Sequence, residues 1–307
     1  MKRRDLLKTM AALPVGVVAA SAYGGTDAGT VVTANTATEE GWNWYSHVLG
    51  FNVAPGELSF LAGRQGAGKT SLALEIALGI DALQAGPTWF FNGACRAQQT
   101  AALMGIELEP TEEQAAGLDY YVRVFRCRRE DKLLNVTFID SAESFSADLG
   151  ELRAAHPYLQ QQAAPTLVIY DADRFDFDNI DEEWADELAA EFHTRQKDCD
   201  ETFNAAMLMT VTLTYAEHMR QSDRQPTLEH LHLNARKAMI ADQTYFIERP
   251  ASDWTVTQDL VSITHANRED VIGTDRSSFV LALDPRTGRF RKPNKDEALQ
   301  ALGLGVV

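Results

Sequence analysis

Residues 63–70 (GRQGAGKT) match the pattern G-x-x-x-x-G-K-[ST] at every fixed position. The glycines of this pattern let the backbone curl so that its N–H groups point toward a bound phosphate. Lys69 then reaches the β- and γ-phosphates of a nucleoside triphosphate, and the Thr70 hydroxyl ligates Mg²⁺. A glycine turn without a ligand is the alternative interpretation. The residues predicted to bind the nucleotide are Gly63, Gly66, Gly68, Lys69, Thr70 and Ser71.

A phosphate-binding loop of this kind needs a carboxylate on a neighbouring strand to hold the magnesium ion through water. Residues 166–170 (TLVIY) form an apolar run that ends in Asp171, at the strand end where ligands gather in parallel sheets. We therefore expect Thr70 and Asp171 to form the metal site, with Lys69 and Asp171 as catalytic residues. Asp173 is the reserve candidate, and an aspartate that merely begins a loop is the alternative.

The elements that must position these residues alternate between strand and helix. A strand is predicted over residues 58–62 directly before the loop, and a helix over 71–83 directly after it. Further strands are predicted over 88–91, 136–139, 166–170 and 207–214, separated by helices over 97–104, 146–162 and 182–193. Such alternation predicts an α/β fold with a mainly parallel sheet and helices on both faces.

The pattern changes after residue 243 to short strands over 244–248, 261–265 and 279–283, with a turn at 284–288 (DPRTG). We expect these strands to extend the sheet as an antiparallel edge on its C-terminal side.

The first 22 residues differ from the rest of the chain. A basic segment precedes an apolar stretch that ends in A-S-A, the order of a secretory signal, and residues 2–8 (KRRDLLK) resemble a twin-arginine export signal. A short tail that docks on a neighbour is the alternative. Neither this stretch nor any other reaches the roughly 20 apolar residues of a stable membrane span. The predicted organisation is a signal-like segment (1–22), a flexible linker (23–40), one nucleotide-binding domain (41–295) and a tail (296–307).

The composition limits the partners of the chain. Its 307 residues include 28 basic and 44 acidic side chains, a net charge of −16, so that any contact with nucleic acid must be local. Cys95, Cys127 and Cys199 have no CxxC or histidine spacing, which argues against a zinc site and a disulfide framework and favours buried thiols.

With these motifs, the chain resembles the carboxyl-terminal motor domain of DnaB-type replicative helicases across residues 41–292. The resemblance implies a RecA-like P-loop NTPase fold, ATP and Mg²⁺ as ligands, a ring of identical subunits, and single-stranded DNA drawn through the ring. It also implies that Arg268 is an arginine finger for a neighbouring subunit. The segments that carry it are 53–57 and 60–64, 68–70 and 73–77, the strand of Asp171, and 210–214, 224–226, 241–242, 246–249, 267–269 and 272–274.

Three positions depart from the family pattern. Ala94 stands where the family has the glutamate that activates water, Tyr215 stands for the glutamine that senses the γ-phosphate, and Ala266 stands for a lysine. A general base contributes about 10²- to 10⁴-fold to a rate, so its loss predicts weak or absent hydrolysis. The candidate substitutes are Glu107, Glu143 and Asp173.

Two interpretations of function follow. The first is an ATP-binding, helicase-like protein of replication or recombination, whose DNA-facing loops lie between residues 216 and 238, where basic residues cluster. A solvated loop is the equal alternative for that cluster. The second is a nucleotide-binding adaptor without hydrolysis. We expect a cytoplasmic location, and periplasmic export by the twin-arginine route is the alternative.

Overall fold

The computed structural model describes residues 51, 53–64, 66–92, 95–111, 122–141, 148–171, 182–212, 241–248, 260–267, 277–291 and 293–294. The predicted signal-like segment, linker and tail lie outside these residues. The helices are α2 (Lys69–Ala82), α3 (Cys95–Leu103), α4 (Leu149–Ala155), α5 (Pro157–Gln161) and α6 (Glu182–Phe203). The strands are β1 (Leu58–Gly63), β2 (Thr88–Asn92), β3 (Glu107–Pro110), β4 (Val122–Arg129), β5 (Lys132–Ser141), β6 (Leu167–Asp171), β7 (Ala206–Thr212), β8 (Gln243–Glu248), β9 (Leu260–Asn267), β10 (Ser277–Asp284) and β11 (Arg289–Arg291).

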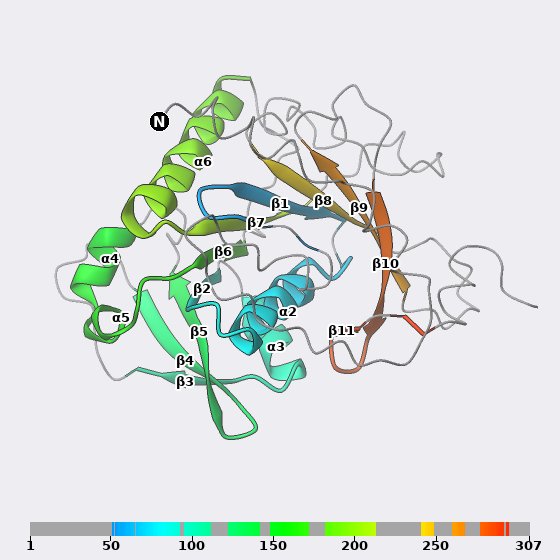
Figure 1. Ribbon diagram of the computed structural model, residues 1–307, viewed down its shortest axis with the longest axis horizontal. Helices are drawn as coiled ribbons and strands as arrows, with labels where there is room; N and C mark the ends of the chain where they lie inside the picture. The colour runs from blue at the N-terminus through cyan, green and yellow to red at the C-terminus, as the bar shows by residue number, and fades with distance from the viewer. Residues whose placement is uncertain are drawn as a thin grey trace, which may run out of the picture. The chain divides into compact units, whose positions relative to one another are not determined.

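All of these strands belong to one sheet, in the order β11-β10-β9-β8-β1-β7-β6-β2-β5-β4-β3 (Figure 1). The six central strands, from β8 to β5, pair in parallel. Strands β9, β10 and β11 continue the sheet beyond β8 in antiparallel fashion. The predicted α/β class, the parallel core and the antiparallel edge on the C-terminal side are therefore confirmed.

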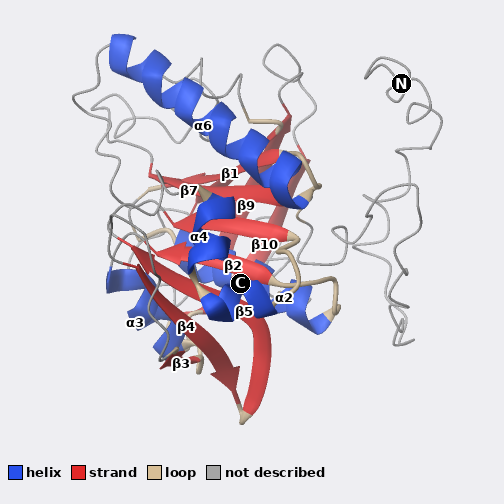
Figure 2. Ribbon diagram, turned by 90° about the vertical axis from the view of Figure 1, so that its left-hand side faces the viewer, coloured by secondary structure: helices blue, strands red, loops and turns tan. Residues whose placement is uncertain are grey.

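Helices cover both faces of the sheet (Figures 1 and 2). Successive residues of a strand point to opposite faces, so Leu61 joins a core with α2 and α3, whereas Phe60 joins a second core with α4, α5 and α6. Because both faces are buried, the central strands are almost continuously apolar, and every residue of β1 is buried.

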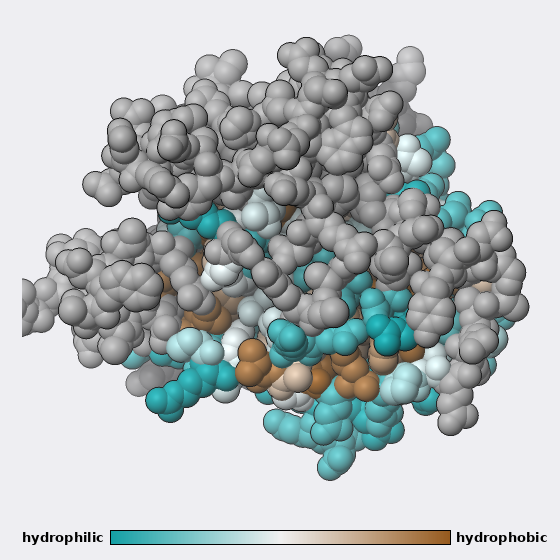
Figure 3. All heavy atoms as spheres, turned by 180° about the vertical axis from the view of Figure 1, so that it is seen from behind, coloured by the Kyte–Doolittle hydropathy of each residue, from teal (hydrophilic) through white to brown (hydrophobic). Residues whose placement is uncertain are grey.

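Two regions differ from the sequence prediction. The helix expected over 146–162 is interrupted, because Pro157 lacks an N–H group and forces the preceding His156 into an extended conformation. Residues 105–134, for which no element was predicted, contribute β3 and β4, so in the described part of the chain α3 is followed by the three strands β3, β4 and β5. The exposed tip of the β4–β5 hairpin, residues 130–132 (EDK), projects at the bottom of Figure 3 as a hydrophilic extension.

Cys127 and Cys199 are free and buried, which confirms the burial expected for these two thiols. Burial raises the pKa of the Cys127 thiol to about 12 and also raises the pKa of Cys199, whose carboxylate neighbours act in the same direction. Both thiols are therefore protonated at neutral pH and unsuited to nucleophilic chemistry. No helix of the described chain is long and apolar enough to cross a membrane.

The beginning of β1 carries an electrostatic conflict that a substitution can relieve. Burial, and then the charge of Asp242, raise the pKa of Glu57 above its usual 4.5. The carboxylate of Asp242 is held by the backbone N–H of Leu58 at 3.0 Å and by Gln196 at 2.9 Å. A raised pKa means that Glu57 contributes to stability below pH 4.5 and loses that contribution as the pH rises through its folded pKa.

We expect Glu57→Gln to raise the free energy of unfolding, because glutamine stays neutral beside Asp242. The increase in the free energy of unfolding over that of the native chain should be larger at about pH 7.5 than at about pH 5.5, because more of Glu57 is ionised at the higher pH. Urea denaturation at both pH values measures it, with the exposed Glu201→Gln of α6 as the control. A gain that shrinks with rising pH would contradict this account.

Candidate nucleotide-binding site

The predicted phosphate-binding loop joins the carboxyl end of β1 to the start of α2, as the sequence predicts. A side chain at Gly63 would place its Cβ 2.8 Å from the backbone oxygen of Ile247 on β8, too close for any other residue. Gly68 has φ of +102°, in the left-handed region that glycine tolerates. A Cβ there would lie 3.2 Å from the ring of Phe290. The backbone of β8 therefore requires glycine at position 63, and the positive φ favours glycine at position 68.

Lys69 is the first residue of α2, and its ammonium lies inside the loop. The Nζ atom donates hydrogen bonds to the backbone oxygens of Gly63 and Arg64, both at 3.1 Å. Lys69 as a whole is only 7% exposed. The structure thus holds a nearly buried positive charge at the place where the loop would receive phosphate.

Thr70 and Asp171 lie in direct contact. The Thr70 hydroxyl is 3.1 Å from Oδ1 and 2.9 Å from Oδ2 of the Asp171 carboxylate, which is 4% exposed. A hydroxyl and a carboxylate are oxygen donors of the kind that Mg²⁺ prefers. These two side chains therefore fit a magnesium ion.

The topology corrects one expectation about Asp171. Its strand β6 is not the neighbour of β1, because β7 lies between them. Thr210 on β7 is in register with Asp171 and donates a hydrogen bond of 2.7 Å to Oδ1. Thr210 was not among the residues predicted from the sequence, because its role depends on the order of the strands and no motif marks it.

The amino end of α2 suits an anion. Among the described residues no side chain caps the helix, and its first turn contains no acidic residue. The first amides of a helix have no intrahelical acceptor, and the helix dipole adds about half a positive charge at this end. Together with Lys69, the helix end provides the positive potential that phosphate groups require.

Glu248 lies on the other side of β1 from Asp171. It directly follows Ile247, which is in register with Gly63, at the carboxyl end of β8. Burial raises the pKa of Glu248, and the nearby charge of Arg64 partly offsets that rise. Glu248 was not predicted as a site residue either, because the pairing of β8 with β1 is not visible in a local pattern.

The residues at the end of β2 bear on the predicted loss of the general base. Asn92 is buried there, in register with Asp171 on one side and Asp140 on the other. The carboxylate of Asp140 is already engaged by Arg123 and, at 3.2 Å, by Gln98. Glu107 lies on β3, which β2, β5 and β4 separate from β6. This separation removes Glu107 from the candidate substitutes.

One of the three departures from the family pattern, Ala266, is described, whereas several other predicted positions lie outside the described residues. Ala266 is in β9, in register with Thr244 of β8. The positions that the structure does not describe are Ala94, Glu143, Asp173, Tyr215, Arg268 and the segment 216–238.

The fold is similar to that of two solved structures. One is an ATPase domain, with a TM-score of 0.55 at 14% sequence identity and coverage of 78% of this chain and 85% of that chain. The other is a DnaB-like replicative helicase, whose structure was studied with its primase interactions, with a TM-score of 0.53 at 17% identity. That match covers 77% of this chain but only 57% of the helicase chain. No family model and no curated protein matches the sequence.

Proposed function

We infer that this chain binds ATP together with Mg²⁺ at the loop between β1 and α2. The contact between the Thr70 hydroxyl and the Asp171 carboxylate is the observation that carries this inference. Two polar side chains from segments far apart in sequence meet beside a glycine loop and a buried lysine, and the likeness to an ATPase domain and a helicase agrees with this. Gly63, Gly66, Gly68, Lys69, Thr70 and Ser71 would contact the nucleotide.

The residues would divide the work by their chemistry. Lys69 would exchange the backbone oxygens of Gly63 and Arg64 for phosphate oxygens. The Thr70 hydroxyl would turn from Asp171 to the metal, and the Asp171 carboxylate would hold the metal's water ligands. The metal neutralises charge on the phosphates when it is bound.

We propose that hydrolysis is weak or lost. Among the described residues, Asp140 on β5 is in register with Asn92 at the end of β2. Its carboxylate already interacts with Arg123 and Gln98. The buried residue at that end is Asn92, an amide that cannot accept a proton at neutral pH. This observation favours the second candidate function, an adaptor that holds ATP as a structural or switching ligand.

The role in replication or recombination is part of the proposal. One solved structure with a similar fold is that of a DnaB-like replicative helicase. By analogy, the chain would form a ring, contact single-stranded DNA, and use Arg268 as a finger for the neighbouring subunit. We place this activity in the cytoplasm, where ATP and DNA are found. A mature chain that begins at Tyr23 would favour twin-arginine export instead.

One titration tests the proposal. Labelled ATP is titrated into the full chain with Mg²⁺, and phosphate release is measured with and without single-stranded DNA. Binding with little or no turnover is the expected result. Turnover stimulated by DNA would eliminate the adaptor, whereas failure to bind ATP would eliminate both candidates.

Thr210→Val tests how the metal site is built. Valine has a similar shape but cannot donate to Asp171, so the carboxylate loses one of its partners. We expect the gain in ATP affinity from Mg²⁺ to fall roughly fivefold, with the affinity for metal-free ATP unchanged. Thr88→Val is the matched control, because its buried hydroxyl has no partner among the described residues. An unchanged Mg²⁺ dependence would contradict a positioning role for Thr210.

A further inference from the structure

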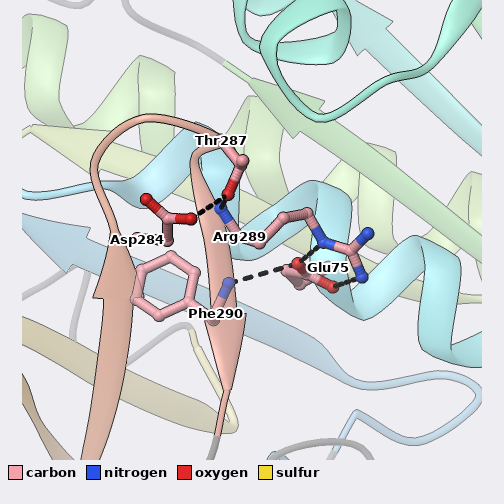
Figure 4. Close-up of polar contacts among 5 residues, drawn as sticks. All are labelled: Glu75, Asp284, Thr287, Arg289 and Phe290. Atoms are coloured by element: carbon pink, nitrogen blue, oxygen red, sulfur yellow. Dashed lines mark hydrogen bonds and ion pairs between the residues drawn. The ribbon is translucent and has the colours of Figure 1, made fainter.

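The last two described strands reach back to the phosphate-binding loop. In the sheet, β9 and β8 separate the β10–β11 hairpin (residues 277–291) from β1. Nevertheless, the Arg289 guanidinium pairs with the Glu75 carboxylate of α2 through both Nε and Nη2 (Figure 4). The backbone N–H of Phe290 also donates to Glu75 at 3.2 Å. Three donors from β11 therefore hold one carboxylate of α2.

The same hairpin also contacts the loop itself. The ring of Phe290 and the side chain of Leu283 lie 3.2 and 3.7 Å from the position that a Cβ would take on Gly68. At the turn, the corresponding position on Gly288 is 3.5 Å from the Ser71 hydroxyl and 3.5 Å from Met104. The hairpin thus packs against the last loop residue and the first turn of α2.

Burial makes this attachment sensitive to Arg289. The Glu75 side chain is 7% exposed and that of Arg289 is 30% exposed. A buried carboxylate is tolerated when it is paired and hydrogen-bonded, so loss of Arg289 would force Glu75 toward water. Glu75 lies less than two turns after Lys69, and a displacement of this part of α2 would be passed to Lys69 and Thr70.

We propose that the β10–β11 hairpin sets the geometry of the phosphate-binding loop, with Arg289 and Phe290 as positioning residues for triphosphate binding. This proposal rests on the proposed function, ATP binding at this loop. It adds that a hairpin at the far edge of the sheet influences the affinity for ATP. Arg289 would act through Glu75 of α2, and Phe290 through Glu75 and Gly68.

The test compares Arg289→Ala, Arg289→Lys and Arg286→Ala in the full chain. Arg286 carries the same charge on the same hairpin, but its side chain is exposed in the turn. Affinities for Mg·ATP and for inorganic tripolyphosphate are measured well below the unfolding temperature. We expect Arg289→Ala to weaken both affinities about tenfold. The loss of an ion pair and its hydrogen bonds corresponds to roughly this change in affinity. Arg289→Lys should recover part of the loss, and Arg286→Ala should bind as the native chain does.

A second readout separates positioning from a contribution to stability alone. Hydrogen exchange at the Phe290 amide of the native chain should slow at least severalfold when Mg·ATP binds, because loop and hairpin are coupled in both directions. Native-like affinity in a folded Arg289→Ala, or exchange unaffected by ATP, would overturn this inference and leave ATP binding intact. Failure of the native chain to bind ATP would overturn the proposed function together with the inference.

Discussion

Replacing Lys69 with alanine is expected to weaken the binding of Mg·ATP roughly 100-fold. The Lys69 ammonium is nearly buried within the loop, bonded to two backbone oxygens that phosphate oxygens would replace. A charge-assisted hydrogen bond in such a site is worth about 1.5–3 kcal/mol, and alanine offers nothing in its place. Alanine also removes a charge that is costly to bury, so the fold should persist.

The measurement is a calorimetric or fluorescence titration with Mg·ATP, accompanied by thermal unfolding in the absence of nucleotide. Lys197→Ala is the matched control, since it removes the same charge from an exposed surface pair with Glu201 on α6. If Lys69→Ala bound as tightly as Lys197→Ala, the loop would not be the nucleotide site.

Replacing Asp171 with asparagine is expected to abolish most of the benefit that Mg²⁺ brings to ATP binding, about 10- to 100-fold in affinity. Asparagine keeps the shape: its oxygen can accept from Thr210, and its amide can donate to the Thr70 oxygen. It cannot supply the negative charge that holds a hydrated magnesium ion. Affinity for ATP without metal should therefore remain close to that of the native chain.

Although Asp171→Asn should weaken ATP binding in the presence of Mg²⁺, it should not reduce the stability of the ligand-free chain. Asp171 is 4% exposed, and a neutral amide avoids the cost of desolvating a carboxylate. Thermal unfolding should thus show a midpoint equal to or above the native one. Asp131→Asn is a suitable control, because Asp131 is exposed in the β4–β5 turn at a φ of +62° that asparagine also tolerates. A large loss of stability, or an intact Mg²⁺ effect, would contradict the assignment of Asp171 to the metal.

Local patterns predicted the parallel core well. The loop at 63–70 fixes a strand before it and a helix after it, and β1 and α2 occur there. The apolar runs that become β2, β6 and β7 are buried on both faces, which is why they were recognisable without long-range information. By contrast, β4 mixes basic and apolar residues next to the edge strand β3, and its pairing with β5 depends on tertiary contacts.

The sequence alone determined which residues have the chemistry to bind a triphosphate, because a glycine loop, Lys69 and Thr70 are contiguous and the spacing itself is the signal. Only the tertiary structure decided which distant groups surround them. The insertion of β7 between β1 and β6 brings Thr210 to Asp171, and the packing of the β10–β11 hairpin against α2 brings Arg289 to Glu75. Strand order and edge packing result from the burial of whole surfaces, and that free energy is spread over many residues and has no local spacing to mark it.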